Sequence, residues 1–100
     1  ARAVRDSQLE IGAVRAGEWL GVNAGKVICV DPESPGQVVA QLVKKLIQPS
    51  HELLTLIEGE GSTPAATRTA TEAVTAAGYE LEIEVHKGGQ PIYAYLIGLE

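Results

Sequence analysis

Residues 34–86 read SPGQVVAQLVKKLIQPSHELLTLIEGEGSTPAATRTATEAVTAAGYELEIEVH. Two helix starts in this stretch share one device, a capping hydroxyl followed by proline at the first helical position, at Ser34-Pro35 and Thr63-Pro64. Apolar residues at helical spacing follow the first start, and small alanines dominate after the second. The stretch therefore predicts one helix over 35–47 and another over 64–77.

Apolar segments between and around these helices predict the strands. The segment 53–57 predicts a buried strand, and residues 79–86 alternate between apolar and acidic side chains. The run 27–30 is apolar on both faces, which predicts a buried central strand. Because helices connect these three strands, right-handed crossovers should make them parallel. A tight turn at Gly88-Gly89-Gln90-Pro91, in which glycine supplies positive φ, should return the chain into a last strand, 92–99, paired antiparallel with 79–86.

The chain before residue 31 predicts short strands. Trp19 to Val22 and Lys26 to Val30 flank Asn23-Ala24-Gly25, where Asn and Gly suit a hairpin loop. Two helices can cover only one face of a sheet of about six strands, which leaves the other face open. The sequence therefore predicts an α/β fold, a two-layer sandwich with a mixed sheet of about six strands and two helices on one face. We expect residues 1–100 to form a single domain.

Composition excludes several classes of protein. The net charge of −5 disfavours a protein that follows nucleic-acid phosphates, and no apolar run approaches the roughly 20 residues of a membrane span. Cys29 is the single cysteine, which excludes an internal disulfide and fits a cytoplasmic location. Within its apolar strand, we expect Cys29 to be a packing residue. The chain has no methionine, so we expect it to be a piece of a larger multidomain protein.

Features that could carry chemistry each have a plainer interpretation. Gly59-Glu60-Gly61-Ser62-Thr63 lies between a strand and a helix start, where backbone amides can hold a phosphate, but it lacks the lysine of a P-loop. The side chains of Glu80, Glu82, Glu84 and His86 are metal-ligand types, but side chains along one straight strand diverge. No local signature joins a serine, a histidine and an aspartate. We therefore expect a plain loop, a solvated acidic row, no metal site and no catalytic residue.

The aromatic residues indicate a partner surface. Tyr93 and Tyr95 share one face of the last strand, and Trp19 lies on a strand of the same sheet. On the open face these rings would form an apolar patch with an acidic rim that steers a basic partner. The alternative is that the helices or a neighbouring domain cover them. The predicted partner-binding residues are Trp19, Tyr93, Tyr95, Glu82, Glu84 and His86.

The final stretch resembles a known family. Residues 84–100, EVHKGGQPIYAYLIGLE, resemble the V-H-x-G-G-Q-P-x-Y-x-Y-x-I-x-x-E ending of the fatty acid kinase A proteins, also described as dihydroxyacetone-kinase-like, DAK phosphatase or DhaL-containing proteins. Residues 3–7, AVRDS, and 15–21, RAGEWLG, resemble the opening of the same C-terminal domain. The likeness runs in register over nearly the whole chain.

This resemblance implies a non-catalytic C-terminal docking or scaffold domain. In such proteins a separate kinase domain holds ATP and magnesium and phosphorylates a fatty acid, which a DegV-like binding protein presents. The resemblance thus implies no cofactor in this chain, contacts with that carrier and with other domains of the parent, and a possible homodimer of the parent. Two alternatives stay open: a regulatory domain that binds a small molecule at the open face, and the C-terminal domain of a dihydroxyacetone (glycerone) kinase.

Overall fold

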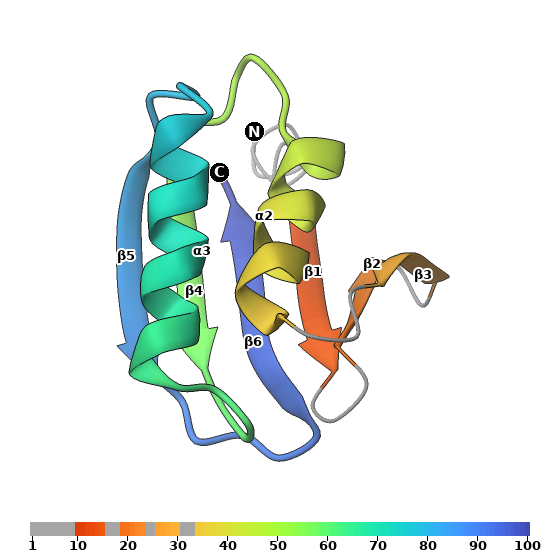
Figure 1. Cartoon of the computed structure of the whole chain (residues 1–100). Coiled ribbons are helices and arrows are strands. Elements are labelled where there is room, and N and C mark those ends of the chain that lie inside the picture. The colour runs from red at the N-terminus through yellow and green to blue at the C-terminus, as the bar shows by residue number, and fades with distance from the viewer. Residues whose placement is uncertain (1–9, 16–18, 24–25, 31–33) are drawn as a thin grey trace, which may run out of the picture.

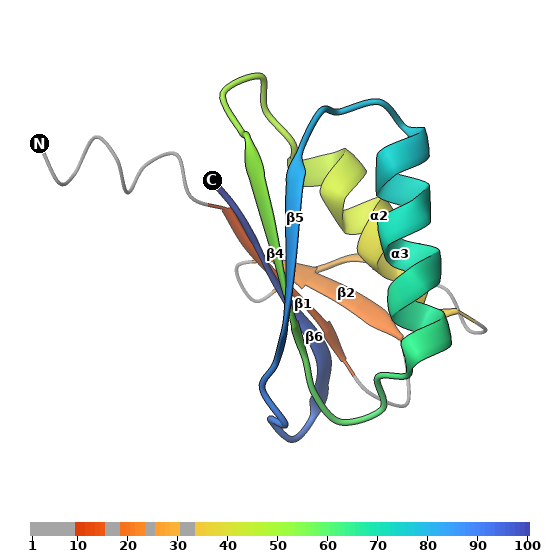
Figure 2. The same ribbon diagram turned by 90° about the vertical axis from the view of Figure 1, so that its left-hand side faces the viewer.

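The computed structural model describes residues 10–15, 19–23, 26–30 and 34–100. Its elements are β1 (Glu10–Arg15), β2 (Leu20–Asn23), β3 (Lys26–Val30), α2 (Pro35–Leu46), β4 (Leu53–Glu58), α3 (Pro64–Ala76), β5 (Glu82–Lys87) and β6 (Tyr93–Leu99). The strands form one six-stranded sheet in the order β3-β2-β1-β6-β4-β5. Both helices lie on the same face of this sheet (Figures 1 and 2). The predicted α/β fold, with a mixed sheet and two helices on one face, is therefore confirmed.

Both helices begin with the predicted capping device. The Ser34 hydroxyl accepts a hydrogen bond from the Gln37 amide at 3.2 Å, and the Thr63 hydroxyl accepts one from the Ala66 amide at 3.0 Å. These bonds satisfy amides that have no partner inside the helix. The two helices also approach each other closely at Gly36, where an added methyl would lie 2.6 Å from the Ala66 carbonyl oxygen. Glycine at this position therefore lets α2 and α3 pack side by side over the sheet.

The order of the strands differs from the predicted order at two places. Among the described strands, β4 and β5 alone pair in parallel, and the four antiparallel ladders that lead from β3 to β4 give β3 the same direction as these two strands, as predicted. The strand β6 lies between β1 and β4 and pairs antiparallel with both. The prediction that the last strand pairs with β5 is thus wrong. The connection after β5 crosses the end of β4 instead of turning back tightly, and the amides of Gly88 and Gly89 both donate to the Glu58 carbonyl. This arrangement puts the apolar β6 in the middle of the sheet and the acidic β5 at its edge.

The strand β3 is an edge strand, so its predicted central position is also wrong. It pairs antiparallel with β2, as the hairpin predicted, and lies at the far end of the sheet from β5. Val27 is 54% exposed, which shows that an apolar run alone does not make a strand central. The loop residues 24–25 and the side chain of Cys29 lie outside the described part of the structure, as do residues 3–7 of the family-like opening.

The register of the ladders separates a covered face from an open face. A methyl on Gly12 would lie 3.4 Å from Leu46 of α2, so Gly12 and its cross-strand partner Ile97 face the helices. Alternation then assigns the other face to Ile11 and to Leu96. The covered face meets the helices in one core whose members are almost fully buried: Val14, Val38, Val39, Leu42, Val43, Leu54, Leu56, Ala70, Val74, Tyr95, Ile97 and Leu99. Of the alanines in the predicted helix 64–77, Ala70 is buried but Ala77 is exposed.

Candidate partner-docking face

Tyr95 lies on the covered face and not on the predicted open face. Its side chain is fully buried, and its hydroxyl lies 2.7 Å from the Thr67 hydroxyl on α3. The ladders pair Tyr95 with Val14 of β1, which is also fully buried, so the helices cover this ring. The expectation that Tyr95 is an exposed interface residue is therefore wrong.

The buried hydroxyl belongs to a short polar chain at the start of α3. The Thr67 hydroxyl donates a hydrogen bond to the Glu58 carboxylate at 2.5 Å. Because a hydroxyl has one hydrogen to donate, Tyr95 acts as the donor in its contact with Thr67. The same tyrosine hydroxyl lies 3.4 Å from the Thr63 carbonyl. Burial raises the pKa of Tyr95 above its ordinary value of 10.0, and the negative charge of Glu58 adds to this effect. The chain of bonds anchors α3 to the sheet.

Of the other two predicted aromatic residues, Trp19 lies toward the core, and Tyr93 lies beside a shift in the register of its strand. Trp19 precedes β2 in a turn with a φ of 50°, donates its amide to the Arg15 carbonyl at 3.0 Å and packs its side chain against the core. Tyr93 is half-buried and pairs with Arg15 across a shift in register between Val14 and Arg15, so simple alternation from Tyr95 does not fix its face. Because Tyr95 and Trp19 lie toward the core, the predicted patch of three aromatic rings on the open face does not form.

An aliphatic strip occupies the open face instead. Ile11 is 59% exposed, and the ladders align its neighbours Ala13, Leu96 and Ile57 across three adjacent strands. A shallow hollow of about 270 Å³ runs along this strip. It is lined by Ile11, Thr55, Ile57, Leu96, Ile97, Gly98 and Glu100. We refer to Ile11, Ala13, Ile57 and Leu96 as the apolar strip.

Sequence reasoning missed the apolar strip, although a signal for it exists. Residues 92–99 carry no charged side chain, so both faces of that strand are apolar. This pattern is typical of a central strand, and its second face must then meet either water or another protein.

The predicted acidic row lies beside this strip. Glu82, Glu84 and His86 are exposed, and the ladder places Glu84 next to Thr55 and His86 next to Ile57 on the open face. The Glu84 carboxylate lies 3.3 Å from the His86 ring nitrogen, in a contact largely open to water. Their predicted position on the open face is confirmed, while their role in binding a partner stays a prediction. Glu80 precedes β5 with a φ of 61° and is not part of the row.

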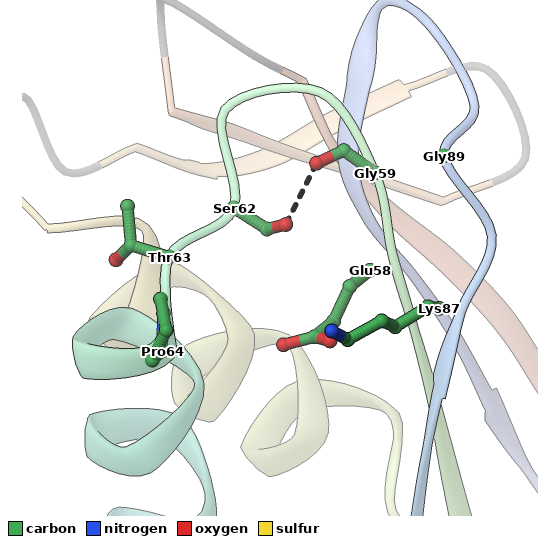
Figure 3. Close-up of a pocket in the computed structure, with 7 residues that line it drawn as sticks. All are labelled: Glu58, Gly59, Ser62, Thr63, Pro64, Lys87 and Gly89. Carbon is green, nitrogen blue, oxygen red and sulfur yellow. Dashed lines mark hydrogen bonds between the residues drawn. The ribbon is translucent and has the colours of Figure 1, made fainter.

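A second hollow, of about 290 Å³, lies at the start of α3 (Figure 3). Glu58 and Lys87 point into it from adjacent strands, and the Ser62 hydroxyl closes the loop by donating to the Gly59 carbonyl at 2.7 Å. The amides of Gly59, Glu60 and Ser62 all donate to carbonyls within the chain. These amides are thus already used, which favours the predicted plain loop over a phosphate-binding one.

The Gly88–Pro91 segment fits its predicted structural role. Gly89 has a φ of 67°, the left-handed conformation that was expected for the turn. Gly88 is needed for a different reason, because a side chain there would collide with Gln90 and Ile57. The side-chain amide nitrogen of Gln90 in turn donates to the Ile57 backbone carbonyl at 3.1 Å. Together these contacts fix the crossing over the end of β4.

The comparisons with known proteins agree with the ending motif. Residues 1–100 match the family of C-terminal domains described as fatty acid kinase A-like. The chain belongs to this family. It is 32% identical over 98 residues to an uncharacterized protein of Staphylococcus haemolyticus, and 31% and 28% identical to uncharacterized proteins of Staphylococcus epidermidis and Staphylococcus aureus. These matches cover 98% of the chain but only 18% of each relative.

The ending motif of this fatty acid kinase A-like domain supplies two strands of the sheet, on either side of β4. Residues 84–100 comprise most of the edge strand β5, the crossing turn and the central strand β6. Among the described residues no three histidine, cysteine or acidic side chains gather as metal ligands would. Across the same described ranges, no helix has the length and apolar character needed to cross a membrane. Within the motif, β6 pairs with both β1 and β4, and Glu84 and His86 of β5 lie on the open face.

Proposed function

We propose that this chain is a non-catalytic docking domain of a fatty-acid-kinase-like parent protein. In this proposal another domain of the parent holds ATP and magnesium and transfers phosphate to a fatty acid, and the present domain binds the DegV-like protein that carries the acid. The family match and the small share of each relative that the chain covers support a role within a larger protein. The same family description favours a fatty acid over dihydroxyacetone as the substrate of the parent.

The observation that carries the proposal is the apolar strip with an acidic row along its side. Apolar side chains that stay in contact with water next to charged residues are typical of protein interfaces, with an apolar centre and a polar rim. Ile11 and Leu96 supply the centre, and Glu82 and Glu84 supply the rim. The rim favours a carrier with basic residues around its binding surface, because opposite charges speed encounter and suppress wrong partners.

A small-molecule site on the same face is the less favoured alternative. The hollow along the apolar strip measures about 270 Å³, and only one charged residue, Glu100, lines it. Pockets for small molecules are usually larger, at about 300–1,000 Å³, and enclose most of the ligand. A shallow strip spread over three strands suits a flat protein surface better.

Titration of the purified chain with the DegV-like carrier tests the docking role. Ile11→Ala and Leu96→Ala should each weaken binding by about 1 kcal/mol or more if the strip is the centre of the interface. Ile92→Ala is a matched control, because Ile92 is 53% exposed but lies in the turn away from the strip, against 59% for Ile11. Equal affinities for Ile11→Ala, Leu96→Ala and Ile92→Ala would refute docking through the strip.

The substrate of the parent needs a separate assay. Full-length parent protein, mixed with ATP, magnesium and carrier loaded with a fatty acid, should form an acyl phosphate. Phosphorylation of dihydroxyacetone in place of the acid would favour the glycerone kinase alternative. A melting screen of the present chain against metabolites tests the regulatory alternative, for which a ligand-dependent rise in melting temperature is the expected sign.

A further inference from the structure

Among the described strands, β5 lies at the edge of the sheet and has a neighbour on one side. In the part of the chain that the structure describes, β5 pairs with β4 alone and forms the edge of the sheet. The Glu82 amide donates to the Glu52 carbonyl at 2.9 Å, and the Gly88 amide donates to the Glu58 carbonyl at 2.8 Å. Because successive residues of a strand direct their backbone groups to opposite sides, the N–H and C=O groups of Ile83, Val85 and Lys87 point away from β4.

No described element covers this edge. Figure 1 shows β5 as the outermost strand, with α3 in front of the sheet and nothing described beyond the strand. Val85 is 42% exposed, although its cross-strand neighbour Leu56 is fully buried beneath the helices. The edge thus offers both free backbone groups and an apolar side chain to an added strand.

The charges beside the edge define which strand would fit. Glu82 and Glu84 lie on the open face, directly in line with the position that an added strand would occupy. A residue opposite each glutamate would have its Cβ about 4.5–5.5 Å away, close enough for a basic side chain to pair with the carboxylate. Pairing with a second copy of this chain would instead bring two acidic rows together, which is unfavourable. The fitting strand is therefore basic on one face.

We propose that the free edge of β5 accepts an extended segment of a partner protein in which basic residues alternate with small apolar ones. The segment adds a seventh strand to the sheet, bonds to the backbone of Ile83, Val85 and Lys87, and covers Val85 with its apolar residues. Its basic residues lie next to Glu82 and Glu84. The inference concerns the edge of the sheet, so it stands whether or not the open face binds the carrier.

The test uses a short synthetic peptide of alternating lysine and valine and the isotope-labelled chain, observed by NMR. On binding, the amides of Ile83 and Val85 should exchange with solvent roughly tenfold more slowly, because they become hydrogen-bonded. Val85→Pro should weaken binding by about tenfold, since proline removes an outward N–H without breaking a bond to β4. Val85→Thr keeps the N–H and the strand preference and should bind the peptide nearly as well as the original chain.

A second arm leaves the chain untouched. A peptide methylated on alternate backbone nitrogens, those that would face β5, should lose binding, and a peptide with glutamate in place of lysine should not bind. Three results would overturn the proposal: no binding of the lysine–valine peptide, equal binding of the methylated peptide, or slowed exchange at Ile57 and Leu96 in place of the edge amides. Self-association of the chain that Val85→Pro abolishes would also overturn it, because the occupant would then be a second copy.

Discussion

The two faces of the sheet are built from alternate residues of the same strands, yet they meet different surroundings. On the covered face, Leu56 and Tyr95 are fully buried beneath α2 and α3, and even the polar hydroxyl of Tyr95 has a partner. On the open face, Ile11 and Leu96 keep contact with water next to the acidic row. The covered face therefore provides the stability of the domain, while the open face can change with little cost to folding and is available for recognition.

A truncation on each face should separate these two roles most strongly. Leu56→Ala should lower the free energy of unfolding by about 2–5 kcal/mol, because it leaves a cavity in the core. Ile11→Ala removes a similar apolar volume from the exposed strip and should change the free energy of unfolding by no more than about 0.5 kcal/mol. Urea unfolding of both variants measures the difference. Comparable losses would mean that the open face is covered in the folded chain.

The crossing turn determines which face β6 presents to the helices, and its two glycines should differ in their effects. Gly88→Ala should lower the free energy of unfolding by about 1–3 kcal/mol, since a new side chain would collide with Gln90 and Ile57. Gly89→Ala meets no atom within 4 Å but must keep a φ of 67°, which should cost about 1 kcal/mol. Thermal unfolding measures both. An effect of Gly89→Ala larger than that of Gly88→Ala would contradict this account.

The buried hydroxyl of the covered face should show itself at high pH. Tyr95→Phe should cost about 1 kcal/mol at neutral pH by removing its hydrogen bond to Thr67. Because the pKa of Tyr95 is raised in the folded chain, the unfolded chain loses this proton first as the pH rises above 10.0. The free energy of unfolding should then fall as the pH rises from 10.0 to the pKa of Tyr95 in the folded chain. Urea unfolding at a series of pH values should show a smaller fall for Tyr95→Phe, and parallel curves for the two proteins would argue against a buried phenol.

Neutralising the acidic row should have the smallest effect on stability. Glu82 and Glu84 are exposed, so Glu82→Gln and Glu84→Gln should each change the free energy of unfolding by no more than about 0.5 kcal/mol. The same variants should slow association with a basic partner, and added salt should reduce the difference from the original chain. A large loss of stability in either variant would mean that the acidic row stabilises the fold, as the residues of the covered face do.

The helices could be predicted from sequence because their signals are local. A capping hydroxyl, a following proline and an apolar period act within a few residues, and both helix starts are where the sequence put them. The acidic alternation of residues 82–86 likewise predicted a face in water. The partners of the strands could not be predicted in this way, because the choice of β4 over β5 as the neighbour of β6 depends on a crossing turn and on long-range packing.

The error about Tyr95 concerns the face of the last strand. The sequence predicted that residues 92–99 pair with 79–86 and that Tyr93 and Tyr95 lie on the face left open by the helices. In the middle of the sheet, the side of β6 that carries Tyr95 lies beneath α3, and Leu96 lies on the other side. The assignment of the two faces of β6 therefore needed its neighbouring strands and the register shift between Val14 and Arg15, which only the three-dimensional structure supplies.

The central position of β6 also has a consequence for synthesis on the ribosome. Residues 93–99 join β1 to β4, yet they follow both strands in the chain, so the two halves of the sheet emerge before the strand that unites them. Until then β1 and β4 each lack a neighbour, and such long-range closure is slow compared with the formation of helices. We expect the nascent chain to hold preformed helices over an incomplete sheet, and to need protection by chaperones until residues 93–99 leave the exit tunnel.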